Sequence, residues 1–182
     1  MKSLQRGEFD QLIEAAPRYI WRKSLVNREV LALVLLHDLA LRCHEMVNLT
    51  IESFDLESKT VTVDGKGSRW AVGKKRCVLP VSERILEHLE RHEYENHLIT
   101  TSTGMPVDAS QYRRLLPVLG QQILGKHVHP HMLRHSRITE LALDKKVDIL
   151  IVMKFARHES VSTTMKYLHF REDWMDEIVH AL

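Results

Sequence analysis

A run of apolar residues from Val30 to Leu41 constrains the fold of this chain more than any other segment. It is apolar on nearly every side of a helix, and a helix that is apolar all round has to be buried. Asn27, just before it, is a typical helix N-cap. The longest uninterrupted apolar stretch, Val30 to Leu36, has only seven residues, and a membrane-spanning helix needs about 20. The run therefore predicts the central core helix of a globular domain, with Arg42 and Glu45 following at its C-terminal end.

The composition is that of an ordinary globular protein. The chain has 182 residues, of which 44% are hydrophobic and 27% charged, and its formal net charge is +2. This length predicts one domain, and the weak positive charge permits nucleic-acid binding without requiring it. The first ten residues contain no apolar signal core. Cys43 and Cys77 give neither a disulfide framework nor a four-ligand zinc pattern, so we expect a cytoplasmic protein with no membrane segment.

One segment has the alternation of β-strands. Lys59–Val63 alternates and is β-branched, Asp64–Gly67 supplies turn residues, and Arg76–Leu79 reads as the returning strand. These segments predict a small antiparallel sheet with Lys66 in or beside its turn. Elsewhere helical periodicity dominates. The expected fold class is therefore mostly α with a small antiparallel β-sheet (α+β).

The first expected helix covers 8–16 and is ended by Pro17. After the hairpin, further helices are expected at about 82–94, 109–124, 131–144, 148–156, 160–168 and 173–181.

The pentad HMLRH at residues 131–135 is the segment most indicative of chemistry. His131 and Arg134 lie one helical turn apart on one face, so both can reach the same anion. Arginine offers a planar fork of donors and histidine exchanges a proton near neutral pH, which suits a phosphate. Tyr167, further along the chain, has a phenolic oxygen that can act as a covalent nucleophile. Taken alone, the pentad is equally typical of an amphipathic helix whose arginine faces solvent.

Six polar residues then follow one another in a recognisable order. They are Arg42, Lys66, His131, Arg134, His158 and Tyr167. In their contexts (LALRCHE, DGKG, HPHMLRHS and ARHESVSTTMKYLHF) the chain resembles the catalytic domain of tyrosine recombinases from about residue 5 to 175. That family comprises phage integrases, Xer-type resolvases and fimbrial phase-switch invertases. The resemblance implies the tyrosine recombinase catalytic-domain fold.

The resemblance also implies an enzyme that breaks and rejoins DNA strands. Tyr167 would attack a phosphodiester to give a 3′-phosphotyrosine and a free 5′-hydroxyl. Its phenol has an ordinary pKa near 10 and needs a base, for which His131 is the candidate. Lys66 would donate a proton to the leaving 5′-oxygen. The protein–DNA ester stores the bond energy, so no cofactor is expected.

The remaining members of the set would stabilise the charge that develops on phosphate. Arg42, Arg134 and His158 would hold the non-bridging oxygens. Glu45 is expected to orient Arg42 or His131 rather than to act as a base. The sequence departs from the family pattern in Leu39–Leu41, which replaces a glycine-containing lead-in to Arg42. It departs again at Ala156–Arg157, where the family more often has Leu-Gly, and the arginine would alter the turn or contact a phosphate.

The histidine-rich segment and the remaining basic residues support weaker predictions. The alternating histidines at 127, 129 and 131, with His135, could suggest zinc, but no carboxylate or thiolate completes the set. We expect no metal, and His129 and His135 to be structural or to face phosphate. Contacts to the DNA backbone are expected from basic residues outside the six, although the same residues could form solvated faces. These are Lys74, Lys75, Arg76, Arg113, Arg114 and Arg157.

The resemblance predicts how the protein is organised. Residues 1–182 would form a single catalytic domain without the usual N-terminal core-binding domain, either as a fragment or as a short family member. The tail, residues 172–182, has an apolar stripe, and either packs on its own domain or docks on a neighbouring protomer. Expected partners are double-stranded DNA, further copies in a tetramer on DNA, and accessory DNA-bending proteins. The isolated chain could be a monomer.

Two other functions remain open from the sequence. A type IB topoisomerase uses similar chemistry to relax supercoils, and a catalytically idle DNA-binding regulator could keep the fold. The intact set of six residues disfavours the regulator. Integration, excision and inversion are all compatible with these motifs, because the DNA sites decide between them.

Overall fold

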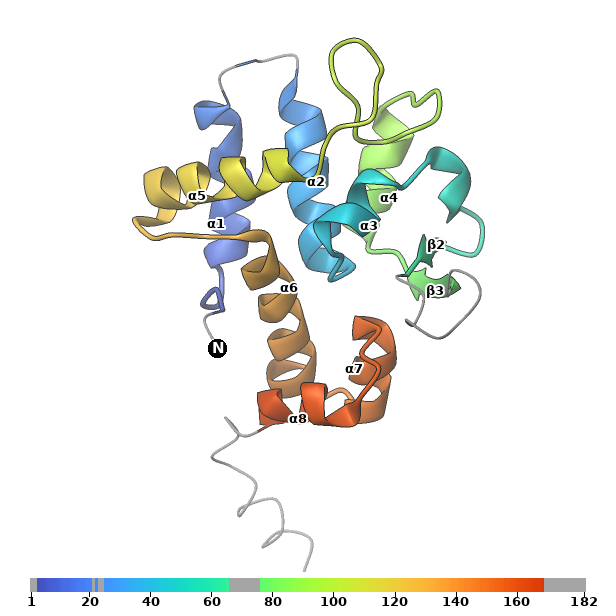
Figure 1. Cartoon of the computed structure of the whole chain (residues 1–182), viewed down its shortest axis with the longest axis vertical. Coiled ribbons are helices and arrows are strands. Elements are labelled where there is room, and N and C mark those ends of the chain that lie inside the picture. Colours follow the sequence, from blue (N-terminus) through green and yellow to red (C-terminus); the bar gives the residue numbers. More distant parts are fainter. Residues whose placement is uncertain (1–2, 21, 23–24, 66–75, 169–182) are drawn as a thin grey trace, which may run out of the picture. The chain divides into compact units, whose positions relative to one another are not determined.

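The computed structural model describes residues 3–20, 22, 25–65 and 76–168, and gives only the backbone for Val161 and residues 166–168. The chain divides into two compact units, residues 1–137 and 138–182. Helices make up most of the described part, with one small antiparallel sheet (Figure 1). The predicted fold class is confirmed. No described helix has the length and apolar character needed to cross a membrane.

Helix α2 (Val26–Asp38) forms the centre of the first unit, as the apolar run predicts. Its bounds differ from the prediction at both ends. Asn27 lies inside the first turn and donates from Nδ2 to His92 Nε2 (2.7 Å), so it is not the N-cap. The helix ends at Asp38 rather than Leu41, because Ala40 takes a left-handed backbone conformation (φ 46°) that breaks the helical path. Along α2, the fully or almost fully buried apolar residues are Leu31, Ala32, Leu33, Val34, Leu35 and Leu36.

Helix α1 (Glu8–Tyr19) packs against α2 and α5 (Ser110–Leu124), and α5 runs across it (Figure 1). The expectation that Pro17 ends this helix is wrong, because Pro17 lies inside α1. A proline at this position removes one backbone hydrogen bond from the helix, and the packing of α1 against α2 and α5 offsets that loss. Ile20 N–H still closes the turn by donating to Ala16 O (3.1 Å).

The sheet has three antiparallel strands in the order β1-β2-β3. They are β1 (Phe54–Asp55), β2 (Thr60–Asp64) and β3 (Arg76–Pro80). The predicted hairpin is β2 and β3, in which Val61 lies opposite Leu79 and Val63 opposite Cys77. Strand β1 was not predicted, because two residues are too few to show an alternation.

Four further described helices lie wholly or mainly in the first unit. Helix α3 (Cys43–Val47) and the 3₁₀-helix η2 (Ile51–Ser53) are too short for a periodicity to predict them. Helix α4 (Glu83–Arg91) has the predicted position. Helix α6 (Pro130–Thr139) carries the HMLRH pentad and continues into the second unit.

The second unit contains the π-helix η3 (Glu140–Asp144), α7 (Ile149–Ala156) and α8 (Val161–Leu168), which contact one another. The single helix expected at 131–144 is correct in extent, but its last five residues are π-helical. The helices expected at 148–156 and 160–168 are present, and that expected at 173–181 lies outside the described residues.

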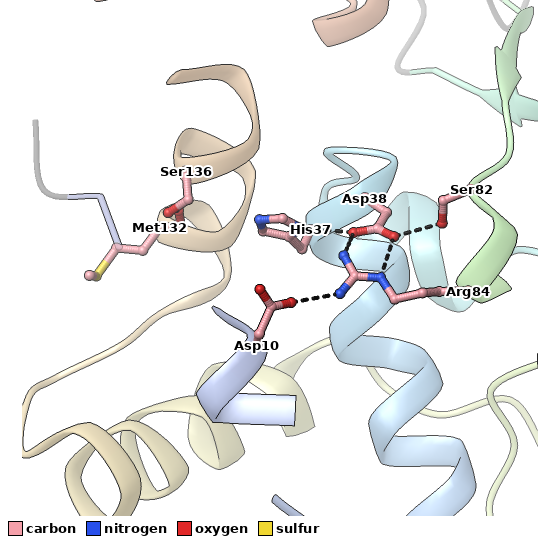
Figure 2. Close-up of polar contacts among 7 residues, drawn as sticks. All are labelled: Asp10, His37, Asp38, Ser82, Arg84, Met132 and Ser136. Atoms are coloured by element: carbon pink, nitrogen blue, oxygen red, sulfur yellow. Dashed lines mark hydrogen bonds and ion pairs between the residues drawn. The ribbon is translucent and has the colours of Figure 1, made fainter. Parts of the chain in front are cut away.

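A buried carboxylate joins three helices of the first unit (Figure 2). Asp38, at the end of α2, accepts hydrogen bonds from Ser82 Oγ (2.6 Å) and from Arg84 Nε (3.1 Å) and Nη2 (2.7 Å). Arg84 also donates to Asp10 of α1 (2.9 Å). Burial opposes ionisation of Asp38, but hydrogen bonds from His37, Ser82 and Arg84 outweigh it and lower its pKa to about 2. The network fixes the end of α2 just before the segment that leads to Arg42.

Candidate active site

Arg42 is held in place by Glu45. Arg42 is the N-cap of α3, and its extended backbone (φ −81°, ψ 152°) places its N–H 2.8 Å from Glu45 Oε2. The Arg42 guanidinium donates to the other carboxylate oxygen, also at 2.8 Å. The Glu45 side chain is fully buried and that of Arg42 is one-third exposed. Glu45 thus holds both the backbone N–H and the guanidinium of Arg42, while part of the arginine side chain still reaches solvent.

Arg134 is tied to the segment before Arg42. It lies on α6, is only 3% exposed, and donates from Nη1 to the carbonyl of Ala40. The left-handed conformation of Ala40 belongs to the turn that presents this carbonyl. A solvated Arg134, the alternative that the pentad alone allows, is therefore wrong. The Ala40 carbonyl thus ties Arg134 to the segment that carries Arg42, a residue 92 positions earlier in the sequence.

His131 completes the group in the first unit. Partial burial of its ring lowers its pKa, and the positive charges of Arg134, Arg42 and Arg113 lower it further. These three arginines are all positively charged, so together they favour an anion beside the histidine. The lowered pKa favours the neutral imidazole, which is the form able to accept a proton.

Two members of the set lie in the second unit. His158 follows α7, and its ring Nδ1 lies 2.8 Å from Thr164 Oγ1 on α8. Tyr167 is in the last turn of α8, and its side chain lies outside the described part. The turn before His158 is formed by Arg157 in a left-handed conformation (φ 56°, ψ 40°). An arginine therefore adopts here the conformation for which glycine is usually selected.

The other basic residues are placed as follows. Lys66, Lys74 and Lys75 lie outside the described residues. Arg76 opens β3 and is 3.4 Å from Asp64, with 78% of its side chain exposed. Arg113 and Arg114 are exposed on α5, and Arg157 is half-buried.

The histidine-rich segment forms a row rather than a chelating cluster. Successive ring centroids from His127 through His129 and His131 to His135 are 6.2, 6.5 and 6.4 Å apart. Within the described part of the chain, no three histidine, cysteine or acidic side chains converge as a metal site would need. Burial and the neighbouring cations lower the pKa of His135 to about 4.

Three features of the site were missed by reasoning from the sequence. They are the Ala40 carbonyl, the effect of Arg113 on His131, and the contact of Thr164 with His158. For Thr164 a signal existed, because it belongs to the TTMKYLH segment that carries Tyr167. Nothing in the sequence pattern indicates the other two.

Residues 2–173 match the phage integrase family model, so the chain belongs to this family. It is 32% identical over 176 residues to tyrosine recombinase XerC of Pseudomonas fluorescens Pf0-1, covering 92% of this chain and 56% of that protein. It is also 32% identical over 153 residues to XerC of Pseudomonas putida KT2440, covering 80% and 49%. The chain thus spans about half the length of these relatives.

Solved structures share the fold. The crystal structure of XerA recombinase superposes over the whole chain and 65% of its own, with a TM-score of 0.76 and 26% identity. The XerH site-specific recombinase bound to its difH substrate matches 98% of this chain and 52% of its own, with a TM-score of 0.74. At 20% identity the second likeness concerns the fold alone. The predicted recombinase fold is confirmed.

Proposed function

We propose that this chain is the catalytic part of a tyrosine-type site-specific DNA recombinase, which cleaves and rejoins strands through a 3′-phosphotyrosine intermediate. The observation that carries the proposal is the convergence of positive charge on His131 from Arg134, Arg42 and Arg113. Such a group favours an anion that approaches it, and phosphate geometry matches the donor forks of arginine. Membership of the phage integrase family supports the same substrate class.

Each proposed role follows from the chemistry of the group. Arg42, Arg134 and His158 stabilise charge on the non-bridging oxygens, where losing one donor costs about a hundredfold to a thousandfold in rate. Tyr167 is the nucleophile and Lys66 protonates the leaving 5′-oxygen. His131, whose lowered pKa favours the neutral ring, accepts the phenolic proton.

Two kinds of supporting residue complete the proposal. Glu45 orients Arg42, a role that its two hydrogen bonds to this residue support. Backbone phosphates are contacted by basic residues outside the six, which fix the position of DNA without reading its sequence. These are Lys74, Lys75, Arg76, Arg113, Arg114 and Arg157. Several copies act together on DNA, and DNA-bending proteins assist them.

A nicked suicide substrate tests the proposal. The wild-type chain is expected to form a covalent protein–DNA adduct, and Tyr167→Phe, which loses only a hydroxyl, to bind the DNA without forming it. A covalent band in the Tyr167→Phe variant would assign the nucleophile elsewhere. A plasmid carrying two target sites separates the other functions: relaxation alone indicates a topoisomerase, and DNA binding without any adduct indicates a regulator.

A further inference from the structure

The contact between His158 and Thr164 carries an inference beyond the six residues of the set. Thr164 is the one polar residue of the described second unit that is completely buried, at 0% exposure. Its Oγ1 lies 2.8 Å from Nδ1 of His158, six positions earlier in the chain. A buried hydroxyl has to be hydrogen-bonded, because an unmet polar group costs about 1–3 kcal/mol. The bond therefore fixes both side chains.

This contact decides which ring nitrogen of His158 can donate a hydrogen bond to a phosphate oxygen. With Nδ1 held by Thr164, a hydrogen bond from His158 to a phosphate oxygen has to come from Nε2. A phosphate oxygen accepts, so Nε2 must carry a proton. A neutral imidazole has one proton, and Nε2 carries it only if the threonine hydroxyl donates to Nδ1.

We propose that Thr164 is a positioning residue for strand cleavage: its hydroxyl donates to Nδ1 and holds neutral His158 as the Nε2–H tautomer. The inference rests on the function proposed above. It gives His158 a donor for the phosphate at neutral pH without requiring a charged ring. The carboxylate of a serine-protease triad likewise holds its histidine in one tautomer, although there the partner accepts from the ring.

The backbone around His158 supports this function. His158 N–H donates to Met153 O (3.1 Å), and the left-handed Arg157 closes the end of α7. His158 is thus held by the hydrogen bond of its backbone N–H and by the contact of its ring Nδ1. Thr164 and Tyr167 lie one turn apart on α8, so the residue that fixes the histidine belongs to the helix that carries the nucleophile.

The tautomer can be measured directly. Histidine-selective ¹⁵N NMR of the full chain near pH 7 is expected to show Nε2 protonated and Nδ1 unprotonated at His158. Thr164→Val keeps the shape and removes the hydroxyl, and it should lower the fraction of this tautomer. Thr164→Ser keeps the hydroxyl and should retain it. A ring protonated on Nδ1, on both nitrogens, or unchanged in Thr164→Val overturns the proposal. Such results would mean that the hydroxyl accepts from the ring or serves only the α8 backbone.

Cleavage of the suicide substrate gives the second readout. Thr164→Val is expected to lower the rate of adduct formation about tenfold to a hundredfold, the range found when a group that orients a metal-binding histidine is removed. Thr164→Ser should stay within a few-fold of wild type. The adjacent Thr163 is exposed, and Thr163→Val is the matched control, with the same change on the same helix. Equal losses in Thr163→Val and Thr164→Val would contradict the inference.

The two proposals fail in different ways. If the wild-type chain forms no adduct with any DNA, the recombinase function fails, while the ¹⁵N spectrum still reports whether Thr164 sets the tautomer. If the wild type is active and Thr164→Val is equally active with a similar melting temperature, the function stands and the positioning role of Thr164 is wrong.

Discussion

Two non-glycine residues occupy left-handed backbone positions next to the proposed catalytic groups. Ala40 (φ 46°) precedes Arg42 by two residues, and Arg157 (φ 56°) directly precedes His158. The family pattern that the sequence resembles has glycine in both segments. A side chain in this conformation costs about 1–2 kcal/mol, which persists only where the surrounding structure enforces it. At Ala40 the carbonyl accepts from Arg134, and the Asp38 network fixes the preceding helix end.

Ala40→Gly should therefore stabilise the protein. Glycine removes the left-handed strain but has a more flexible unfolded state and lacks the buried methyl group of Ala40, so the expected net gain is below about 1 kcal/mol. Urea unfolding would measure it. Ala32→Gly is the matched control, because Ala32 is equally buried but lies inside helix α2, and it should lose at least about 1 kcal/mol. A loss of stability in Ala40→Gly as large as that of Ala32→Gly would show that position 40 carries no such strain.

Lys66 is predicted to protonate the leaving 5′-oxygen. A leaving group that needs no proton should bypass it. Replacing the bridging 5′-oxygen with sulfur is expected to restore much of the cleavage lost in Lys66→Ala, whereas Arg134→Ala stays defective because its role is charge stabilisation. Suicide-substrate kinetics with both DNAs measure this. If sulfur rescues neither variant, or rescues Lys74→Ala or Lys75→Ala instead, the proton donor is another group.

The contacts of the site that could be predicted are those between residues close together in the sequence. The spacing of His131 and Arg134 within one turn, and of Arg42 and Glu45 within three residues, can be read directly from the sequence. The bond from Arg134 to the Ala40 carbonyl joins distant segments, and any residue has a carbonyl. A sequence pattern therefore cannot predict such a contact.

At the scale of elements, long periodic segments were predictable and short or irregular ones were not. The core helix α2, the β2–β3 hairpin and the helices α4 to α8 follow from hydrophobic periodicity. The ends of α1 and α2 were misplaced, because tertiary packing carries α1 past Pro17 and the turn at Ala40 stops α2 early. The π-helical continuation of α6 has the same apolar spacing as an ordinary helix over five residues, so no pattern could distinguish it.

The Asp38 network, which links α1, α2 and α4, should make the stability of the protein sensitive to acid. A carboxyl whose pKa falls from 3.8 to about 2 on folding contributes about 2 kcal/mol of stability. Because the folded-state pKa is the lower one, this contribution is present above about pH 4 and is lost as the pH falls to about 2. Asp38→Asn should remove it, which urea unfolding at pH 7 and between pH 2 and 5 would measure.

Asp10 provides the matched control for this prediction, because it binds the same arginine from the surface. Its side chain is 63% exposed, whereas that of Asp38 is 2% exposed. An exposed ion pair contributes about 0–1 kcal/mol, so Asp10→Asn should change stability little at any pH. Equal losses in the two variants at pH 7 would mean that burial of Asp38 does not matter.

At the scale of the whole molecule, the proposed cooperation of several copies on DNA requires a surface that joins them. The tail, residues 172–182, has an apolar stripe of Trp174, Met175, Ile178, Val179 and Leu182 in the sequence. We propose that it docks on a neighbouring protomer, since cyclic exchange of one helix links subunits without a new fold. Deleting 172–182 should then spare binding of single protomers but weaken cooperative binding and strand exchange.

A gel-shift titration on DNA carrying one or two sites measures this cooperativity. Ile178→Asp, on the apolar stripe, should reproduce the deletion, because a buried charge disrupts an apolar contact. Asp176→Ala, on the opposite face of the same segment, is the matched control and should bind cooperatively. A tail that packs only on its own domain predicts the reverse pattern: a lower melting temperature for both the deletion and Ile178→Asp, with cooperativity unchanged.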